Sequence, residues 1–110
     1  MNENSKIGLI GGGSWATAIV KMLCENVSSV NWWMRNEDSI NHIETYGHNP
    51  NYISDADLKK SKLCLSSNIN TIVENSDYLV LAVPSVFLKS TLNSLNVSLK
   101  DKIIISAIKG

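Results

Sequence analysis

The stretch Lys6-Ile-Gly-Leu-Ile10-Gly-Gly-Gly-Ser-Trp-Ala16 decides the fold of this 110-residue chain. Its first five residues form a compact apolar run that predicts a strand, and three glycines follow directly. From Trp15 to Glu25, apolar side chains recur at helical spacing, which predicts a helix. A strand, a glycine turn and a helix in this order open a βαβ unit, the building block of a parallel sheet.

The glycine turn matches the pattern G-x-G-x-x-G/A, which is typical of a dinucleotide-binding site when a strand precedes it and a helix follows it. Gly11 permits the tight turn, Gly13 lets backbone amides approach a pyrophosphate, and Ala16 keeps the helix close to the strand. The start of the helix offers N–H groups and a partial positive charge to the phosphates. The alternative is a sharp turn without a ligand, which three glycines disfavour because of their conformational entropy. A kinase-type phosphate loop is excluded because no Gly-Lys-Ser/Thr follows.

The rest of the chain alternates strands with helices. Further strands are expected at residues 30–34, 62–65, 78–83 and 102–108, and further helices at 37–46, 69–74 and 85–95. Asn36 and Asn68 are expected to cap the starts of two of these helices, and Gly47 to end one of them. Alternation of this kind gives an α/β fold, and right-handed crossovers favour a Rossmann-type doubly wound parallel sheet in the order 3-2-1-4-5 with helices on both faces. Residues 1–110 are therefore expected to form one dinucleotide-binding domain.

The composition and net charge of the chain limit the kinds of binding partner that we expect. The chain has 44% hydrophobic and 18% charged residues, which is ordinary for a globular domain. Ten basic and ten acidic side chains cancel to a formal net charge of zero. We therefore expect neither a nucleic acid nor a membrane as a partner, because both would require a clustered basic excess.

Other features bear on compartment and on metal binding. Cys24 and Cys64 lie in apolar runs and are expected to be buried, reduced thiols. The N-terminus lacks the pattern of a signal peptide and no segment is apolar enough to span a membrane, so a cytoplasmic location is expected. His42 and His48 are expected to be solvated and not to form a metal pair, so no metal site is predicted.

The end of the second strand bears on the choice between NAD and NADP. A site selective for NAD usually has Asp or Glu there, which binds the ribose hydroxyls. Residues 31–36 contain no acid, and Arg35 occupies this position. A guanidinium could stack on adenine and pair with a 2′-phosphate, so we favour NADP(H); a solvated surface arginine is the alternative. A clear preference for NADH in a titration would contradict this hypothesis.

Two later strands end at the same expected ligand crevice. Pro84 follows the fourth strand and is a candidate cofactor-binding residue. Phe87, one turn further, either faces a nicotinamide ring or belongs to the apolar stripe of its helix. Lys109 follows the fifth strand, where a lysine could bind a phosphate or polarise a carbonyl oxygen; an exposed lysine without a role is the alternative.

Together, these segments resemble the N-terminal domain of bacterial NAD(P)-dependent glycerol-3-phosphate dehydrogenase. The similar segments keep the order and spacing of that family: Ile10-Gly-Gly-Gly-Ser-Trp-Ala-Thr-Ala18, Trp33-Met-Arg35, Asn49-Pro-Asn-Tyr-Ile53, Leu81-Ala-Val-Pro-Ser85 and Ser106-Ala-Ile-Lys-Gly110. The Ser14-Trp15 pair and the terminal Lys-Gly are more specific than the glycines alone. Ala16 departs from the glycine that the family usually has, a change that the general fingerprint tolerates.

The resemblance implies reversible reduction of dihydroxyacetone phosphate to sn-glycerol 3-phosphate, a precursor of phospholipids, with NADP or NAD as cofactor. Ser14 and Trp15 would contact the dinucleotide phosphates, Arg35 would lie at the adenosine end and Phe87 near the nicotinamide. Lys109 would be catalytic and would contact both cofactor and substrate. The small phosphorylated substrate would also need a helical C-terminal domain to which nothing in this chain corresponds. The full-length enzyme is expected to be a homodimer, and this chain alone to bind the dinucleotide and catalyse nothing measurable.

Two other functions stay open at this point. The chain could be the cofactor domain of another reductase, such as a ketopantoate or hydroxyacid reductase, or a free-standing nucleotide-sensing module; a methyltransferase fits less well because it too prefers an acid after the second strand. Residues 103–105 predict a strand suited to cover on both faces, yet it would lie at the edge of the sheet. That observation favours a truncated dehydrogenase, and it predicts self-association through this edge, which light scattering would detect.

Overall fold

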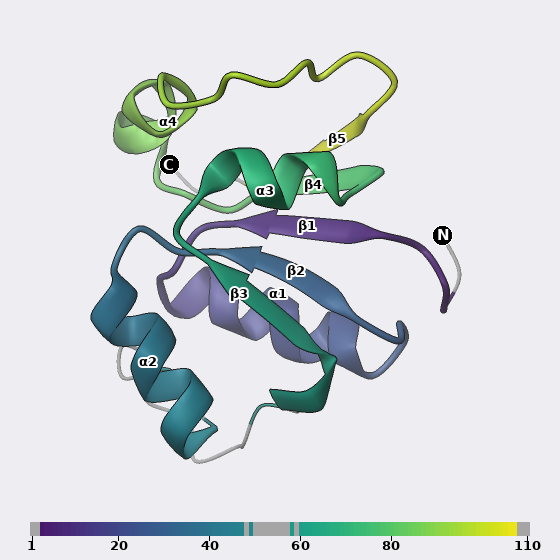
Figure 1. The fold of residues 1–110 in the computed structure, drawn as a ribbon, viewed down its shortest axis with the longest axis vertical. Coiled ribbons are helices and arrows are strands. Elements are labelled where there is room, and N and C mark those ends of the chain that lie inside the picture. The colour runs from purple at the N-terminus through teal and green to yellow at the C-terminus, as the bar shows by residue number, and fades with distance from the viewer. Residues whose placement is uncertain (1–2, 48, 50–57, 59, 108–110) are drawn as a thin grey trace.

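The computed structural model describes residues 3–47, 49, 58 and 60–107. Strands and helices alternate along the chain (Figure 1). The strands are β1 (Ile7–Ile10), β2 (Val30–Trp33), β3 (Leu63–Ser66), β4 (Tyr78–Leu81) and β5 (Ile103–Ser106). The helices are α1 (Ser14–Cys24), α2 (Glu37–Tyr46), α3 (Ile69–Glu74) and α4 (Ser85–Leu92), with a 3₁₀ turn, η1, at Lys60–Lys62.

The strands form a five-stranded parallel sheet in the order β3-β2-β1-β4-β5. This order confirms the predicted doubly wound topology, and it places β1 at the centre, with Ile7 opposite Val30 on one side and Tyr78 on the other. The chain leaves β1 toward β2 and later returns to the other side of β1 through β4. A switch point of this kind leaves a crevice beyond the carboxyl ends of β1 and β4.

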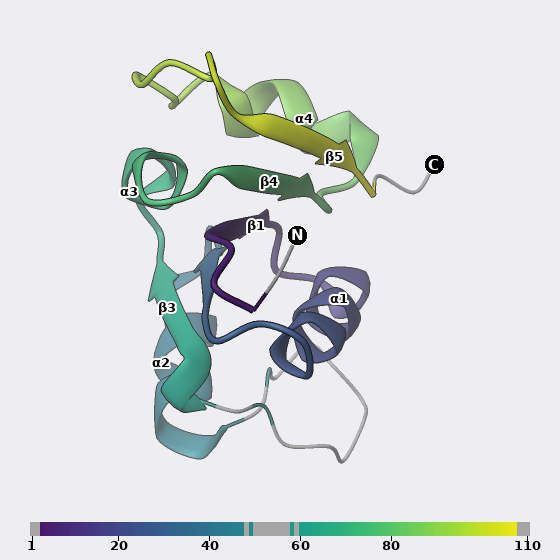
Figure 2. The ribbon, with the colours of Figure 1, turned by 90° about the vertical axis from the view of Figure 1, so that its right-hand side faces the viewer.

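Both faces of the sheet are covered, which gives two hydrophobic cores. Residues of α1 and α2 pack with Trp32 on one face, and residues of α3 and α4 pack with Trp33 on the other. Figure 2 shows α1 and α3 on opposite sides of the sheet. Neighbouring tryptophans enter different cores because successive side chains of a strand point to opposite faces.

Local signals placed both ends of α2 and the start of α3 correctly, whereas α4 ends at Leu92 and not at residue 95 as predicted. The Asn36 side chain accepts hydrogen bonds from the backbone N–H groups of Asp38 and Ser39, and Asn68 caps α3 in the same way through Asn70. Gly47 ends α2 with φ 79°, a left-handed conformation that glycine adopts without strain. None of the described helices is both long and apolar enough to span a bilayer.

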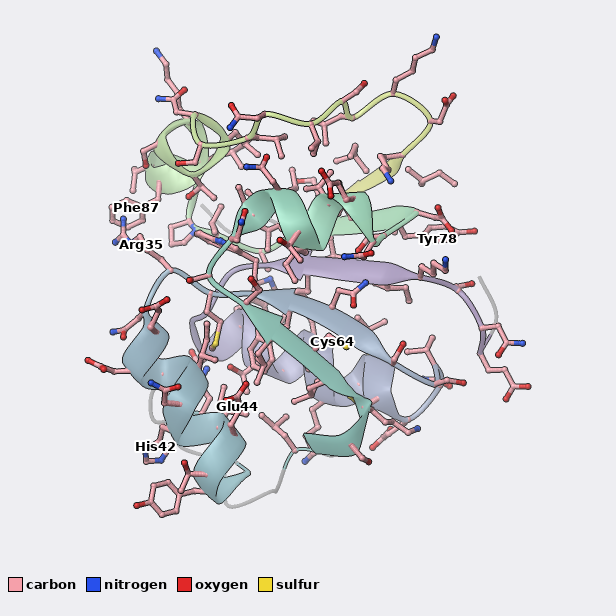
Figure 3. All side chains as sticks on the ribbon, viewed as in Figure 1. Arg35, His42, Glu44, Cys64, Tyr78 and Phe87 are labelled. Atoms are coloured by element: carbon pink, nitrogen blue, oxygen red, sulfur yellow. The ribbon has the colours of Figure 1, made fainter. Side chains whose placement is uncertain are left out.

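Two expectations about single side chains were wrong. Cys24 is buried as predicted, but Cys64 is exposed on the edge strand β3 (Figure 3). Cys64 lines a hollow between β3 and α3, together with Asn31, Thr71 and Asn75, and this hollow stays open to solvent. His42 is half-buried, with its ring centroid 4.7 Å from that of Tyr46, instead of solvated. His48 lies outside the described residues.

The β5 strand is an exposed edge. Ile103, Ile104 and Ile105 are 54%, 43% and 38% exposed, so neither face of β5 is covered by the described residues. The strand was expected at 102–108; it spans Ile103–Ser106, and residue 108 lies outside the described part. Self-association through this edge stays a prediction.

Candidate functional site

A cleft of about 220 Å³ lies at the carboxyl ends of β1, β2 and β4. Gly12 and Gly13 line it after β1, Arg35 after β2, and Pro84 and Phe87 after β4. The topology therefore brings together segments that are far apart in the sequence, at the position where doubly wound sheets bind their ligands.

The backbone at Gly11 explains why the turn must begin with glycine. Its φ is +142°, which residues with a side chain rarely adopt. A Cβ atom there would lie 2.7 Å from the carbonyl oxygen of Ala82, because the loop after β4 passes directly over the turn. Gly11 is thus required by the fold itself.

Gly13 has no comparable structural reason to be glycine. Its φ is −81°, which any residue adopts, and a Cβ atom would meet no atom within 4 Å. Gly13 lines both the 220 Å³ cleft and a second hollow of about 230 Å³ beside Ser14, Trp15 and Pro84. The open space in front of Gly13 lets a ligand approach the backbone closely, as a pyrophosphate requires.

The start of α1 adds a favourable field for an anion. Gly13 caps the helix without a side-chain hydrogen bond, and the first turn contains no acidic residue. The positive end of the helix dipole and the first N–H groups therefore face the cleft unopposed by a carboxylate of that turn. An 11-residue helix with an uncapped start at a cleft is well suited to hold a phosphate.

Arg35 supplies the only charge among the described residues that line the cleft. Its guanidinium carbon lies 5.8 Å from the centroid of the Phe87 ring, a cation–π contact visible in Figure 3. Nearby Glu37 accepts a hydrogen bond from the Ser67 hydroxyl at 3.0 Å and lines a different hollow. The described walls of the cleft therefore carry a cation and no carboxylate, as an anionic ligand needs.

Trp15 joins the first turn of α1 to the end of β5. Its indole N–H donates a hydrogen bond to the carbonyl oxygen of Ala107 at 2.6 Å, although the side chain is 48% exposed. Lys109, the predicted catalytic residue, lies outside the described residues, two positions beyond Ala107. No three His, Cys, Asp or Glu side chains in the described ranges lie together as metal ligands would.

Residues 6–110 match the family model described as the N-terminus of NAD-dependent glycerol-3-phosphate dehydrogenase. The chain belongs to this family. The match covers the strand, the glycine turn and both walls of the cleft, and it agrees with the resemblance found in the sequence.

Relatives and solved structures agree with this assignment. The glycerol-3-phosphate dehydrogenase [NAD(P)+] of Macrococcus caseolyticus is 32% identical over 106 residues, which cover 96% of this chain and 32% of that protein. The enzyme of the same name from Clostridium botulinum is 34% identical over 107 residues, with the same two coverages. The structure of Plasmodium falciparum glycerol-3-phosphate dehydrogenase superposes with a TM-score of 0.81 at 26% identity, covering 97% of this chain and 33% of that one. This chain spans about a third of the length of the relatives it matches.

The structure brings most of the predicted site residues together. Gly13, Arg35, Pro84 and Phe87 line one cleft, and Ser14 and Trp15 border the adjoining hollow. Phe87 is 47% exposed, so it is not the core residue that the helical stripe allowed. The resemblance placed Arg35 and Phe87 at opposite ends of a dinucleotide, whereas the structure places their side chains in contact.

Three buried side chains that the sequence did not single out hold the carbonyl groups of the glycine turn. Trp32 Nε1 donates to Gly11 O at 2.6 Å, Asn49 Nδ2 to Gly12 O at 3.0 Å, and Thr17 Oγ1 to Gly13 O at 2.8 Å. Trp32 and Asn49 are 21 and 37 residues from their partners, so no local pattern could reveal these contacts. Thr17 and Asn49 stand in segments of the sequence that resemble the family, whereas Trp32 does not.

Proposed function

We propose that this chain binds NAD(P)(H) in the cleft between the glycine turn, Arg35 and Phe87. The observation that carries the proposal is the open space at Gly13, directly in front of the uncapped start of α1. The amides of the glycine turn and of the first turn of α1, those of Gly12, Gly13, Ser14 and Trp15, would hold the pyrophosphate there. Membership of the glycerol-3-phosphate dehydrogenase family, whose relatives carry NAD(P)+ in their names, supports the choice of ligand.

We place the adenosine half of the ligand at Arg35. The guanidinium would pair with a 2′-phosphate, which favours NADP(H), because no acidic side chain lines the described walls of the cleft. Phe87 contacts Arg35, so we propose that Phe87 borders the same half of the dinucleotide instead of the nicotinamide. The two side chains then form one recognition unit, a cation beside an aromatic face.

In the whole protein, we propose reversible hydride transfer between NAD(P)H and dihydroxyacetone phosphate, giving sn-glycerol 3-phosphate. Bound NAD(P)H would supply the hydride. The Lys109 ammonium would stabilise the negative charge that develops on the carbonyl oxygen of the substrate. A helical C-terminal domain would provide the remaining substrate contacts, the full-length enzyme would be a cytoplasmic homodimer, and residues 1–110 alone would be inactive.

Calorimetric titration of the chain with NADPH and NADH tests the first step. We expect one site per chain, with NADPH bound more tightly than NADH. Absence of binding to either dinucleotide would overturn the proposal, and tighter binding of NADH would overturn the role of Arg35. In a parallel assay, the chain should not oxidise NADPH when dihydroxyacetone phosphate is added; measurable turnover would overturn the proposed need for a further domain.

A further inference from the structure

The carbonyl oxygens of Gly11, Gly12 and Gly13 are all held from one side. Their donors are three different side chains from three parts of the chain: Trp32 on β2, Thr17 on α1, and Asn49 beyond the end of α2. Each donor residue is 0% exposed, whereas Gly13 at the tip of the turn is exposed. The anchors thus lie in the protein interior, beneath the turn, and the ligand side lies above it.

Asn49 and Thr17 form a hydrogen-bond relay in which the donors are matched to acceptors. One Nδ2 hydrogen of Asn49 goes to Gly12 O at 3.0 Å and the other to Thr17 Oγ1 at 2.7 Å. The Thr17 hydroxyl then donates its own hydrogen to Gly13 O at 2.8 Å. Because an amide nitrogen has two hydrogens and a hydroxyl has one, this relay uses all three of them and fixes the orientation of both side chains.

Anchored carbonyls determine where the amides of the turn point. In a planar trans peptide, the C=O of one residue and the N–H of the next point in opposite directions. Carbonyls of Gly11, Gly12 and Gly13 that point inward therefore direct the N–H groups of Gly12, Gly13 and Ser14 outward. Gly13 O also accepts the first helical hydrogen bond of α1, from the Thr17 backbone N–H at 3.0 Å. At Gly11 and Gly12, glycines alone would leave the orientation of the carbonyls loosely determined, because glycine accepts many backbone conformations.

We propose that Thr17, Asn49 and Trp32 are positioning residues for the cofactor, which pre-orient the amides of the turn toward the pyrophosphate. The proposal rests on the proposed dinucleotide binding and deepens it. None of the three side chains needs to touch the ligand. Their effect reaches it through the carbonyls of the turn, by lowering the conformational freedom that the loop would lose on binding.

The test compares a ligand that has a pyrophosphate with one that lacks it. ADP carries the pyrophosphate, whereas adenosine 2′-monophosphate presents a phosphate to Arg35 and none to the glycine turn. We expect Thr17→Val, which removes the hydroxyl at nearly constant volume, and Asn49→Leu to weaken ADP binding about five- to tenfold, the range of one or two hydrogen bonds. Both variants should bind adenosine 2′-monophosphate within about twofold of wild type.

Thr17→Ser is the matched control because it keeps the hydroxyl, and it should bind ADP like the wild type. Equal loss of both ligands, unchanged ADP binding, or a Thr17→Ser variant that behaves like Thr17→Val would overturn the positioning role. If one of the two variants does not fold, as circular dichroism would show, the other decides, since Thr17 and Asn49 lie on different segments. A wild-type chain that binds neither ADP nor NADPH would instead overturn the proposed function.

Discussion

The starts of α1 and α2 lie on the same side of the sheet, after neighbouring strands, and differ in what closes them. At α2, the Asn36 side chain accepts hydrogen bonds from two N–H groups at 2.8 and 3.3 Å, and Glu37 and Asp38 occupy the first turn. At α1, Gly13 offers no side chain and the first turn has no acid. The first N–H groups of α2 are bonded by a side chain of the protein, whereas those of α1 have no side-chain cap and are available to a ligand.

The comparison shows that the role of a glycine at a helix start can be inferred from the cap that it does not provide. Asn36 contributes to stability through its cap, which is typically worth about 1 kcal/mol. Gly13 forgoes that contribution, although its backbone conformation would accept a side chain and the space in front of it is open. We therefore interpret Gly11 and Asn36 as residues of the fold and Gly13 as a residue of the binding site.

The largest effect is expected from Gly11→Ala. A side chain at φ +142°, with its Cβ atom 2.7 Å from Ala82 O, should lower the free energy of unfolding by about 2–4 kcal/mol. Urea unfolding followed by circular dichroism measures this loss. Gly13→Ala is the matched control and should lose no more than about 1 kcal/mol, the usual cost of alanine at a helix start. Equal destabilisation by both changes would contradict the separation of roles within the turn.

Gly13→Asp should give the start of α1 the side-chain cap and the negative charge that the start of α2 already has. The carboxylate would cap α1, so stability should be kept or raised, while its charge and bulk at the phosphate position should weaken NADPH binding more than about a hundredfold. Calorimetry measures the affinity and thermal unfolding the stability. Gly13→Ala separates bulk from charge and should weaken binding less. Unchanged NADPH affinity in Gly13→Asp would remove Gly13 from the site.

Arg35→Ala tests whether the side chain of Arg35 binds the ligand. Arg35 lies just before α2, whose own first N–H groups are already capped by Asn36. NADPH affinity should fall about tenfold, a typical loss for one charge-assisted contact, and NADH affinity less than about threefold. Arg35→Lys, which keeps the charge without the planar group, should be intermediate. Titration with both dinucleotides gives the two ratios. Equal loss for NADPH and NADH would contradict recognition of the 2′-phosphate.

The smallest effect is expected from Asn36→Ala. Loss of the cap should lower the free energy of unfolding by about 1 kcal/mol and leave NADPH affinity within about twofold. Urea unfolding and calorimetry on the same preparation measure both. A large loss of affinity with little loss of stability would show that the start of α2 also serves the ligand.

Local rules account for what could be predicted. The order β3-β2-β1-β4-β5 followed from alternating elements and right-handed crossovers, and the caps at Asn36 and Asn68 from residue type and position. Predictions failed for two side chains whose surroundings could not be told from residue type and local hydrophobicity. Cys64 lies in an apolar run but is exposed, because it lines a hollow between β3 and α3 that stays open to solvent. His42 was expected in solvent and instead lies against Tyr46.

The strand, the glycine turn and the helix that follows could be recognised from the sequence alone, and with them the proposed place of the phosphate site. The reason is that backbone freedom and side-chain period act over a few residues. Only the tertiary structure decided which glycine serves the fold, that Arg35 meets Phe87, and that Trp32, Asn49 and Thr17 hold the turn from beneath. Most of these contacts join residues that are distant in sequence, so they exist only once the sheet has brought its strand ends together.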